Sequence, residues 1–147
     1  MSAESRVFVD TNVIAYAYDK ASTTKRASAL PVIRELWESR RGCVSVQVLQ
    51  ELFVTLTAKL EKPLGIERAR RVVEHTSEWH VHAPNGDDVL AAIRLHERYR
   101  VSFWDSMIVR SASVLGCDVL LSENLNAGQR YDGVLVVDPF SSFAASD

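Results

Sequence analysis

Three acidic residues stand at positions where metal chemistry is feasible. Asp10 closes a short apolar run, Glu51 lies within a helical pattern, and Asp105 lies near the start of another helical pattern. Three carboxylates brought together would repel one another and take up protons, and a bound divalent cation removes that penalty. Because these ligands are all oxygen donors, they favour a hard ion, Mg²⁺ with Mn²⁺ as a substitute, over zinc.

A cation held by so few carboxylates keeps coordination positions for water and for a phosphate oxygen. It could activate a water for in-line attack on phosphorus and neutralise the charge on the leaving oxygen. The reaction indicated is hydrolysis of a phosphodiester bond, which leaves a 3′-hydroxyl and a 5′-phosphate. We therefore expect Asp10, Glu51 and Asp105 to be the catalytic residues and the metal ligands.

Each of these acids also has an ordinary structural interpretation. Asp10 could cap the helix that follows it, and Ser102 with Asp105 fits a capping box. Glu51 lies past the first turn of its helix, where it could be a solvated or salt-bridged glutamate at the rim. Taken one at a time, the three residues leave both interpretations open.

Apolar runs rich in β-branched residues alternate with stretches of helical period, which predicts an α/β fold. We expect a three-layer α/β/α arrangement around a five-stranded, mainly parallel sheet. The expected strands are residues 7–10, 43–46, 79–82, 118–121 and 134–137. Helices are expected over about 48–60, 66–77, 89–95 and 107–115, with Asn85 or Asp87 as a cap of the third and Gly116 ending the last.

The acids and several polar residues follow the expected strands directly. In an open, doubly wound sheet, ligands bind beyond the carboxyl ends of the strands. Thr11 and Asn12 follow the first strand and could orient Asp10 or a water, although a local turn role is an alternative. Residues 122–124 follow the fourth strand, which predicts supporting roles there for Ser122, Glu123 and Asn124.

Composition and charge set wider limits. The 147 residues are 47% hydrophobic, enough for one domain over residues 1–147, and the net charge of −2 gives no global attraction to a polyanion. Cys43 and Cys117 have no zinc-ligand spacing and are expected to be reduced core residues. Since no signal peptide or membrane-length apolar run is evident, we expect a cytoplasmic protein without a membrane partner.

Other polar and aromatic residues carry weaker indications. Two arginine clusters could hold phosphates or be solvated helix faces, and Trp104 could stack on a base but fits a core position better. The histidines have no metal-ligand spacing and receive no catalytic role. These residues are Arg68, Arg70 and Arg71, then Arg94, Arg98 and Arg100, and the histidines His75, His80, His82 and His96.

Four segments together resemble a known family. They are residues 9–13 (VDTNV), 45–52 (SVQVLQEL), 102–108 (SFWDSMI) and 121–129 (LSENLNAGQ), followed by Asp138-Pro139-Phe140. Their order and separation are similar to those of the PIN domain, specifically of VapC-type toxins from bacterial toxin-antitoxin pairs. The likeness runs over nearly the whole chain, although no one of the segments is specific by itself.

This resemblance implies a doubly wound sheet and a Mg²⁺-dependent endoribonuclease that acts on structured RNA. It also implies a homodimer and a VapB-like antitoxin, whose C-terminal segment would lie across the acidic cleft. Asp10, Glu51 and Asp105 fall on the family's first three acids, with the second able to act through water. The position of Asn124 is commonly an aspartate in the family, and an amide supplies no charge, which leaves occupancy by two metals open.

Other classes of protein fit the sequence less well. Dehalogenase-type phosphatases require an aspartate two residues after the first, and receiver domains an acidic pair with a strand-end phospho-acceptor, whereas Asn12 stands two residues after Asp10. A nucleotide-binding Rossmann protein would show a glycine-rich loop after the first strand. The remaining alternative is a PIN scaffold with weakened catalysis that binds RNA or an antitoxin.

Overall fold

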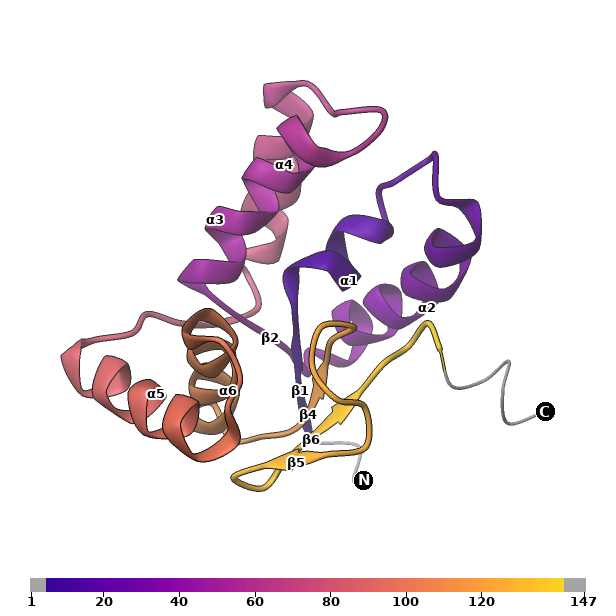
Figure 1. Ribbon diagram of the computed structural model, residues 1–147. Helices are drawn as coiled ribbons and strands as arrows, with labels where there is room; N and C mark the ends of the chain where they lie inside the picture. The colour runs from indigo at the N-terminus through magenta and orange to yellow at the C-terminus, as the bar shows by residue number, and fades with distance from the viewer. Residues whose placement is uncertain (1–4, 142–147) are drawn as a thin grey trace.

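The computed structural model describes residues 5–141 and has a six-stranded sheet at its centre (Figure 1). The strand order is β3-β2-β1-β4-β6-β5. Every neighbouring pair runs parallel except β5 and β6, which run antiparallel. The strands are β1 (Arg6–Val9), β2 (Gly42–Ser45), β3 (His80–His82), β4 (Cys117–Leu121), β5 (Arg130–Tyr131) and β6 (Val134–Val137). The predicted α/β class with a mainly parallel sheet is confirmed.

The sixth strand corrects the prediction of five. β5 pairs with β6 through Arg130 opposite Leu135 and Tyr131 opposite Val134. The turn between the two strands consists of Asp132 and Gly133, whose φ angles are 49° and 89°. An Asp-Gly pair is a strong hairpin signal. A strand of two residues, however, is too short to show an alternating pattern, so the sequence prediction omitted it.

The helices cover both faces of the sheet. Figure 1 shows α1 and α2 on one side of the strands and α5 and α6 on the other, with α3, η1 and α4 extending past the end of β2. The bounds are α1 (Thr11–Tyr16), α2 (Thr23–Ser39), α3 (Val46–Val54), the π-helix η1 (Thr55–Lys59), α4 (Ile66–Thr76), α5 (Gly86–Tyr99) and α6 (Phe103–Val114). Among residues 5–141, no helix is long and apolar enough to cross a membrane.

The longest helix, α2, lies outside the predicted elements. It has 17 residues and contains Pro31, which in a helix interior removes a hydrogen bond and normally disfavours the helix. Only Ala29, Ile33 and Leu36 are buried, at steps of four and three residues. This narrow apolar face is a weak periodic signal, and α2 ends at Arg40 in the left-handed conformation, where a glycine would have marked the end in the sequence.

The predicted helices near the site are present, but α5 and α6 begin at Gly86 and Phe103, earlier than the expected residues 89 and 107. Ser45 caps α3 by accepting a hydrogen bond from the Val48 amide at 3.3 Å. The predicted helix over 48–60 is α3 continued by η1, so its second half has π rather than α geometry. Asn85 caps α5 in a capping box with Asp88, and Gly116, at φ 72°, ends α6.

The core lies around the three central strands, β2, β1 and β4. Every residue of β2 is buried, as are Val7, Phe8 and Val9 of β1. Cys43 and Cys117 are buried free thiols, as predicted. Because these strands are parallel neighbours, the residues that follow them emerge at one edge of the sheet.

Candidate acidic site

Asp10 lies at the carboxyl end of β1 and is 6% exposed. It is the N-cap of α1, since its Oδ1 accepts a hydrogen bond from the Thr11 amide at 2.8 Å. Its Oδ2 accepts a hydrogen bond from Ser122 Oγ at 2.9 Å, and Ser122 is fully buried directly after β4. The carboxylate is therefore fixed from two neighbouring strands, and each oxygen has spare lone pairs for a further partner.

The buried Asp10 carboxyl has a pKa raised from 3.8 to about 6. Burial is the largest cause, because it penalises the charged form. The hydrogen bonds from Thr11 and Ser122 oppose it, while the charges of Glu51 and Asp105 raise the pKa further. The three acids named from the sequence are thus close enough to repel one another, and a cation among them would relieve both burial and repulsion.

Glu51 is exposed on α3 and its carboxylate faces α1. Its Oε1 accepts a hydrogen bond from Thr11 Oγ1 at 3.3 Å and one from Gln47 Nε2 at 3.4 Å. Gln47 Nε2 also lies 3.3 Å from the backbone oxygen of Trp104, at the start of α6. A chain of long hydrogen bonds therefore links α1, α3 and α6 around the acids.

Asp105 is in the first turn of α6. Its amide donates to Ser102 Oγ at 3.0 Å, so Ser102 caps the helix. The reciprocal bond of the capping box is missing, and among residues 5–141 the Asp105 carboxylate has no hydrogen bond or ion pair. Its capping role is thus confined to the backbone, and its carboxylate remains available to a ligand.

The acids do not form a tight cluster. Within the part of the chain that the structure describes, no three His, Cys, Asp or Glu side chains are gathered closely enough to hold a metal together. This spacing still suits Mg²⁺, which usually keeps several waters and is bound through only one or two carboxylates. The charges of Glu51 and Asp105 both act on Asp10, so the three acids lie in one neighbourhood without a closed ligand cage.

The other predicted residues after β4 separate into two groups. Ser122 holds Asp10, and the Asn124 amide donates to Ser122 Oγ at 3.1 Å. Glu123 is engaged by Lys25, whose Nζ lies 2.9 Å from its Oε2. Glu123 therefore does not replace the acid that Asn124 lacks.

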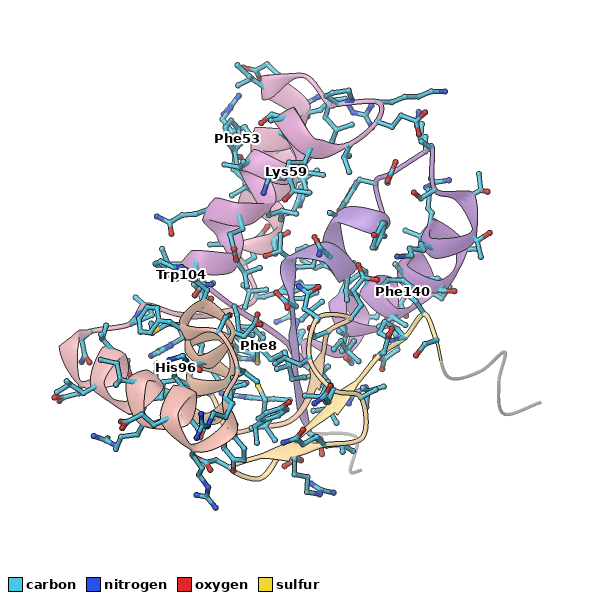
Figure 2. The ribbon with its side chains drawn as sticks, viewed as in Figure 1. Phe8, Phe53, Lys59, His96, Trp104 and Phe140 are labelled. Carbon is cyan, nitrogen blue, oxygen red and sulfur yellow. The ribbon has the colours of Figure 1, made fainter. Side chains whose placement is uncertain are left out.

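A hollow of about 290 Å³ lies between α1 and η1. Asn12, Tyr16, Thr55 and Lys59 are among its lining residues, together with Asp19 and Glu61. Figure 2 shows Lys59 on the side of this segment that faces α1. Single π-turns within α-helices are frequent at functional sites, because they redirect side chains. The hollow begins at Asn12, two residues after Asp10 in the chain.

Gln47 and Lys25 are site residues that sequence reasoning missed. Gln47 lies one helical turn before Glu51, a spacing that places both on one face. Lys25 lies in α2, which was outside the predicted helices, and its Nζ also lies 3.1 Å from the Tyr16 hydroxyl. The helical spacing to Glu51 could have identified Gln47, whereas no sequence pattern indicated Lys25.

The structure gives different outcomes for the arginine, histidine and tryptophan residues considered in the sequence. Arg70 pairs with Glu67 and Glu74 on α4, as expected of a solvated helix face. His82 is buried with Asp88 and Ser111, in a structural contact between β3 and the two following helices. The core interpretation of Trp104 is wrong, because this side chain is 64% exposed.

Comparisons with known proteins agree with this architecture. A toxin-antitoxin complex from Klebsiella pneumoniae has 18% identity and a TM-score of 0.68 over 92% of this chain and 98% of that chain. DNA-bound VapBC from Salmonella typhimurium has 25% identity and a TM-score of 0.63 over the same shares. VapC20 of Mycobacterium tuberculosis, a sarcin-ricin loop cleaving toxin, has 20% identity and a TM-score of 0.56 over 78% of this chain and 86% of that chain.

The sequence itself gives one further match. Comparison with curated proteins found no match. A family profile described as the PIN domain matches residues 7–131, from β1 to β5, which includes all three acids. This chain belongs to the PIN domain family.

Proposed function

We propose that this protein is a Mg²⁺-dependent endoribonuclease that acts as the VapC-type toxin of a toxin-antitoxin pair. The observation that carries the proposal is the buried Asp10, whose pKa is raised to about 6 beside Glu51 and Asp105. A PIN domain that needed Asp10 only as a helix cap would gain nothing from two further acids near it. The arrangement instead supports the proposal of a cation-binding site.

Asp10 and Asp105 are the proposed metal ligands, and Glu51 the residue that acts through water. A bound cation supplies Lewis acidity and neutralises the negative charge that develops at the phosphate. Ser122 and the Thr11 amide hold the Asp10 carboxylate in one orientation, so that no reorganisation is needed when substrate arrives. The Thr11 hydroxyl and Gln47 hold Glu51, whose carboxylate can accept a proton from a water aligned with phosphorus.

The proposed substrate is structured RNA, and the structurally similar proteins support this choice. VapC20 is described as cleaving the sarcin-ricin loop, and two other neighbours are complexes with antitoxins. We propose a VapB-like antitoxin whose C-terminal segment occupies the hollow between α1 and η1 and covers Asp10. Such a protein would act in the cytoplasm, where its RNA is.

We also propose a homodimer. The exposed apolar residues Val89, Leu90 and Ile93 lie within one turn of α5 and are 38%, 56% and 41% exposed. A second copy of the chain would cover this surface. Sedimentation of the purified chain, with Leu90→Ser as the disrupting variant, tests the dimer independently of catalysis.

Cleavage by the partner-free protein tests the main proposal. The purified protein should cut RNA when Mg²⁺ is present and should stop cutting when a chelator is added. Asp10→Asn should abolish cutting and leave the circular dichroism spectrum unchanged. Asp118→Asn is the matched control, because Asp118 is an exposed aspartate on β4. Unchanged cleavage by Asp10→Asn would exclude the proposed mechanism.

A binding protein with weakened catalysis is the second candidate. It is favoured by Asn124, which supplies no charge, and by the pairing of Glu123 with Lys25, which withholds the nearest other acid. The same preparation distinguishes the two: this candidate would bind RNA or the antitoxin but cut no faster than Asp10→Asn.

A further inference from the structure

Trp104 is an exposed aromatic residue directly beside a proposed metal ligand. Its side chain is 64% exposed, whereas Trp37 and Trp79 pack against the core. Scattered exposed apolar residues are normal and need no explanation by themselves. The position of Trp104 is what sets it apart, because its Cα is only about 3.8 Å from that of Asp105.

The indole is also held in place. Trp104 belongs to the first turn of α6, which Ser102 caps, and its backbone oxygen lies 3.3 Å from Gln47 Nε2. The Phe103 ring packs edge-on against it, with centroids 5.1 Å apart and an angle of 73° between the rings. Figure 2 shows Trp104 at the start of α6, next to the start of α3. A ring supported in this way loses little freedom when a ligand binds it.

The indole has unused binding capacity. Among residues 5–141, its N–H has no hydrogen-bond acceptor, and Phe103 is its only aromatic neighbour. An aromatic face with a free donor at its edge matches a nucleobase, which offers a flat π-surface and carbonyl oxygens. Of the residues next to Trp104, Asp105 is acidic and Gln47, which contacts the Trp104 backbone oxygen, is polar, and such neighbours suit an RNA strand.

We infer that Trp104 stacks on an RNA base next to the scissile phosphate and helps to choose the cleavage site. The inference rests on the proposed ribonuclease function. A phosphate drawn to a cation that Asp10 and Asp105 would hold brings its flanking nucleotides past the adjacent residue of α6. Stacking of this kind tolerates several bases but binds larger ring systems better, and therefore predicts a preference rather than a strict sequence requirement.

Three substitutions separate stacking from bulk. Trp104→Phe keeps a ring, Trp104→Leu keeps apolar volume without one, and Trp104→Ala removes both. We expect kcat/KM to fall roughly tenfold in the Leu and Ala variants and less in the Phe variant. The control is Ile66→Ala, because Ile66 is 68% exposed at the start of α4 and should change nothing.

The sharper readout is the RNA sequence around the cut. Sequencing of the new 5′ ends from total RNA gives the wild-type preference, and a short oligonucleotide with that site is then made with and without the flanking base. Loss of the base should slow the wild-type enzyme about as much as Trp104→Ala slows it on the intact oligonucleotide. Trp104→Ala should cut the oligonucleotides with and without the flanking base at the same rate, since the two changes remove the same contact.

Other outcomes overturn the inference. If Trp104→Leu cuts at the wild-type rate with the wild-type base preference, the ring does not stack. If the variants lose activity only through a changed oligomeric state in sedimentation or lost binding of an antitoxin, Trp104 is a protein contact. If Trp104→Ala weakens Mg²⁺ binding in calorimetry, the residue supports Asp105 instead.

Failure of the function itself is recognised separately. A wild-type protein that does not cut RNA in Mg²⁺ contradicts the proposed ribonuclease. Fluorescence anisotropy with a labelled oligoadenylate in chelator then decides the stacking alone. Equal affinity of the wild type and Trp104→Ala there refutes it, and weaker binding by the variant supports it.

Discussion

The buried Asp10 should make the metal-free protein less stable than its neutral variant. The pKa of this carboxyl is 3.8 in the unfolded chain and about 6 in the folded protein. Its stabilisation of the folded state is therefore complete below pH 3.8 and is lost as the pH rises through about 6. The rise from 3.8 to about 6 corresponds to about 3 kcal/mol, at ~1.36 kcal/mol for each pH unit. Above pH 7 the charged Asp10 therefore costs stability of this order.

Asp10→Asn removes the charge and keeps the shape. The asparagine oxygen can accept from the Thr11 amide, and its NH₂ group can donate to Ser122 Oγ. We expect urea unfolding in chelator at pH 7.5 to give a free energy about 3 kcal/mol higher for Asp10→Asn than for the wild type. At pH 4 the two proteins should be nearly equal, because the wild-type carboxyl is then protonated in the folded state.

Added Mg²⁺ should reverse the order of stability. A ligand at a hundred times its Kd stabilises the folded state by ~2.7 kcal/mol, and only the wild type can bind it well. Asp118→Asn, an exposed aspartate, should follow the wild type at every pH. An Asp10→Asn variant that is less stable at pH 7.5, or a difference that does not change with pH, would refute the reasoning.

Three other substitutions test the surroundings of the acids. Ser122→Ala removes a hydrogen bond of 2.9 Å from the charged form of Asp10, so the pKa of Asp10 should rise further and Mg²⁺ affinity should fall roughly tenfold in calorimetry, unless another donor takes its place. Asn124→Asp adds a charge where the family commonly has one, and should tighten Mg²⁺ binding; unchanged affinity would show that this position lies outside the site. His82→Ala takes the imidazole partner from the buried Ser111 hydroxyl and one of the partners of Asp88, which keeps Arg110, and should lower the free energy of unfolding by about 1–3 kcal/mol, without changing RNA cleavage.

The neighbourhood of the three acids follows from the sequence because each acid is positioned by a local element. Asp10 ends a strand and Glu51 and Asp105 lie in strongly periodic helices, so parallel pairing of β2, β1 and β4 is enough to bring them to one edge. The missed features depend on contacts between distant segments. Lys25 reaches Glu123 across 98 positions of the chain, and nothing near either residue indicates the pair.

Exposure is the other property that the local pattern misjudges. Trp104 has the sequence context of a core residue at the start of a buried helix, and Ser106, Met107 and Ile108 directly after it are indeed buried. The first turn of α6, however, projects beyond the sheet edge to present Asp105. A residue two positions from the core thus lies in solvent, and only the placement of the whole helix reveals it.

The two interpretations of Asp10, helix cap and metal ligand, are complementary rather than exclusive. As the cap of α1, its Oδ1 must face the Thr11 amide, and that constraint leaves Oδ2 directed at Ser122. The helix start thereby fixes the carboxylate without neutralising it, since two hydrogen bonds do not offset its burial and the pKa stays near 6. A cap that served only the helix could be exposed to water at no cost, so the burial of Asp10 supports the proposed role of this carboxylate as a metal ligand.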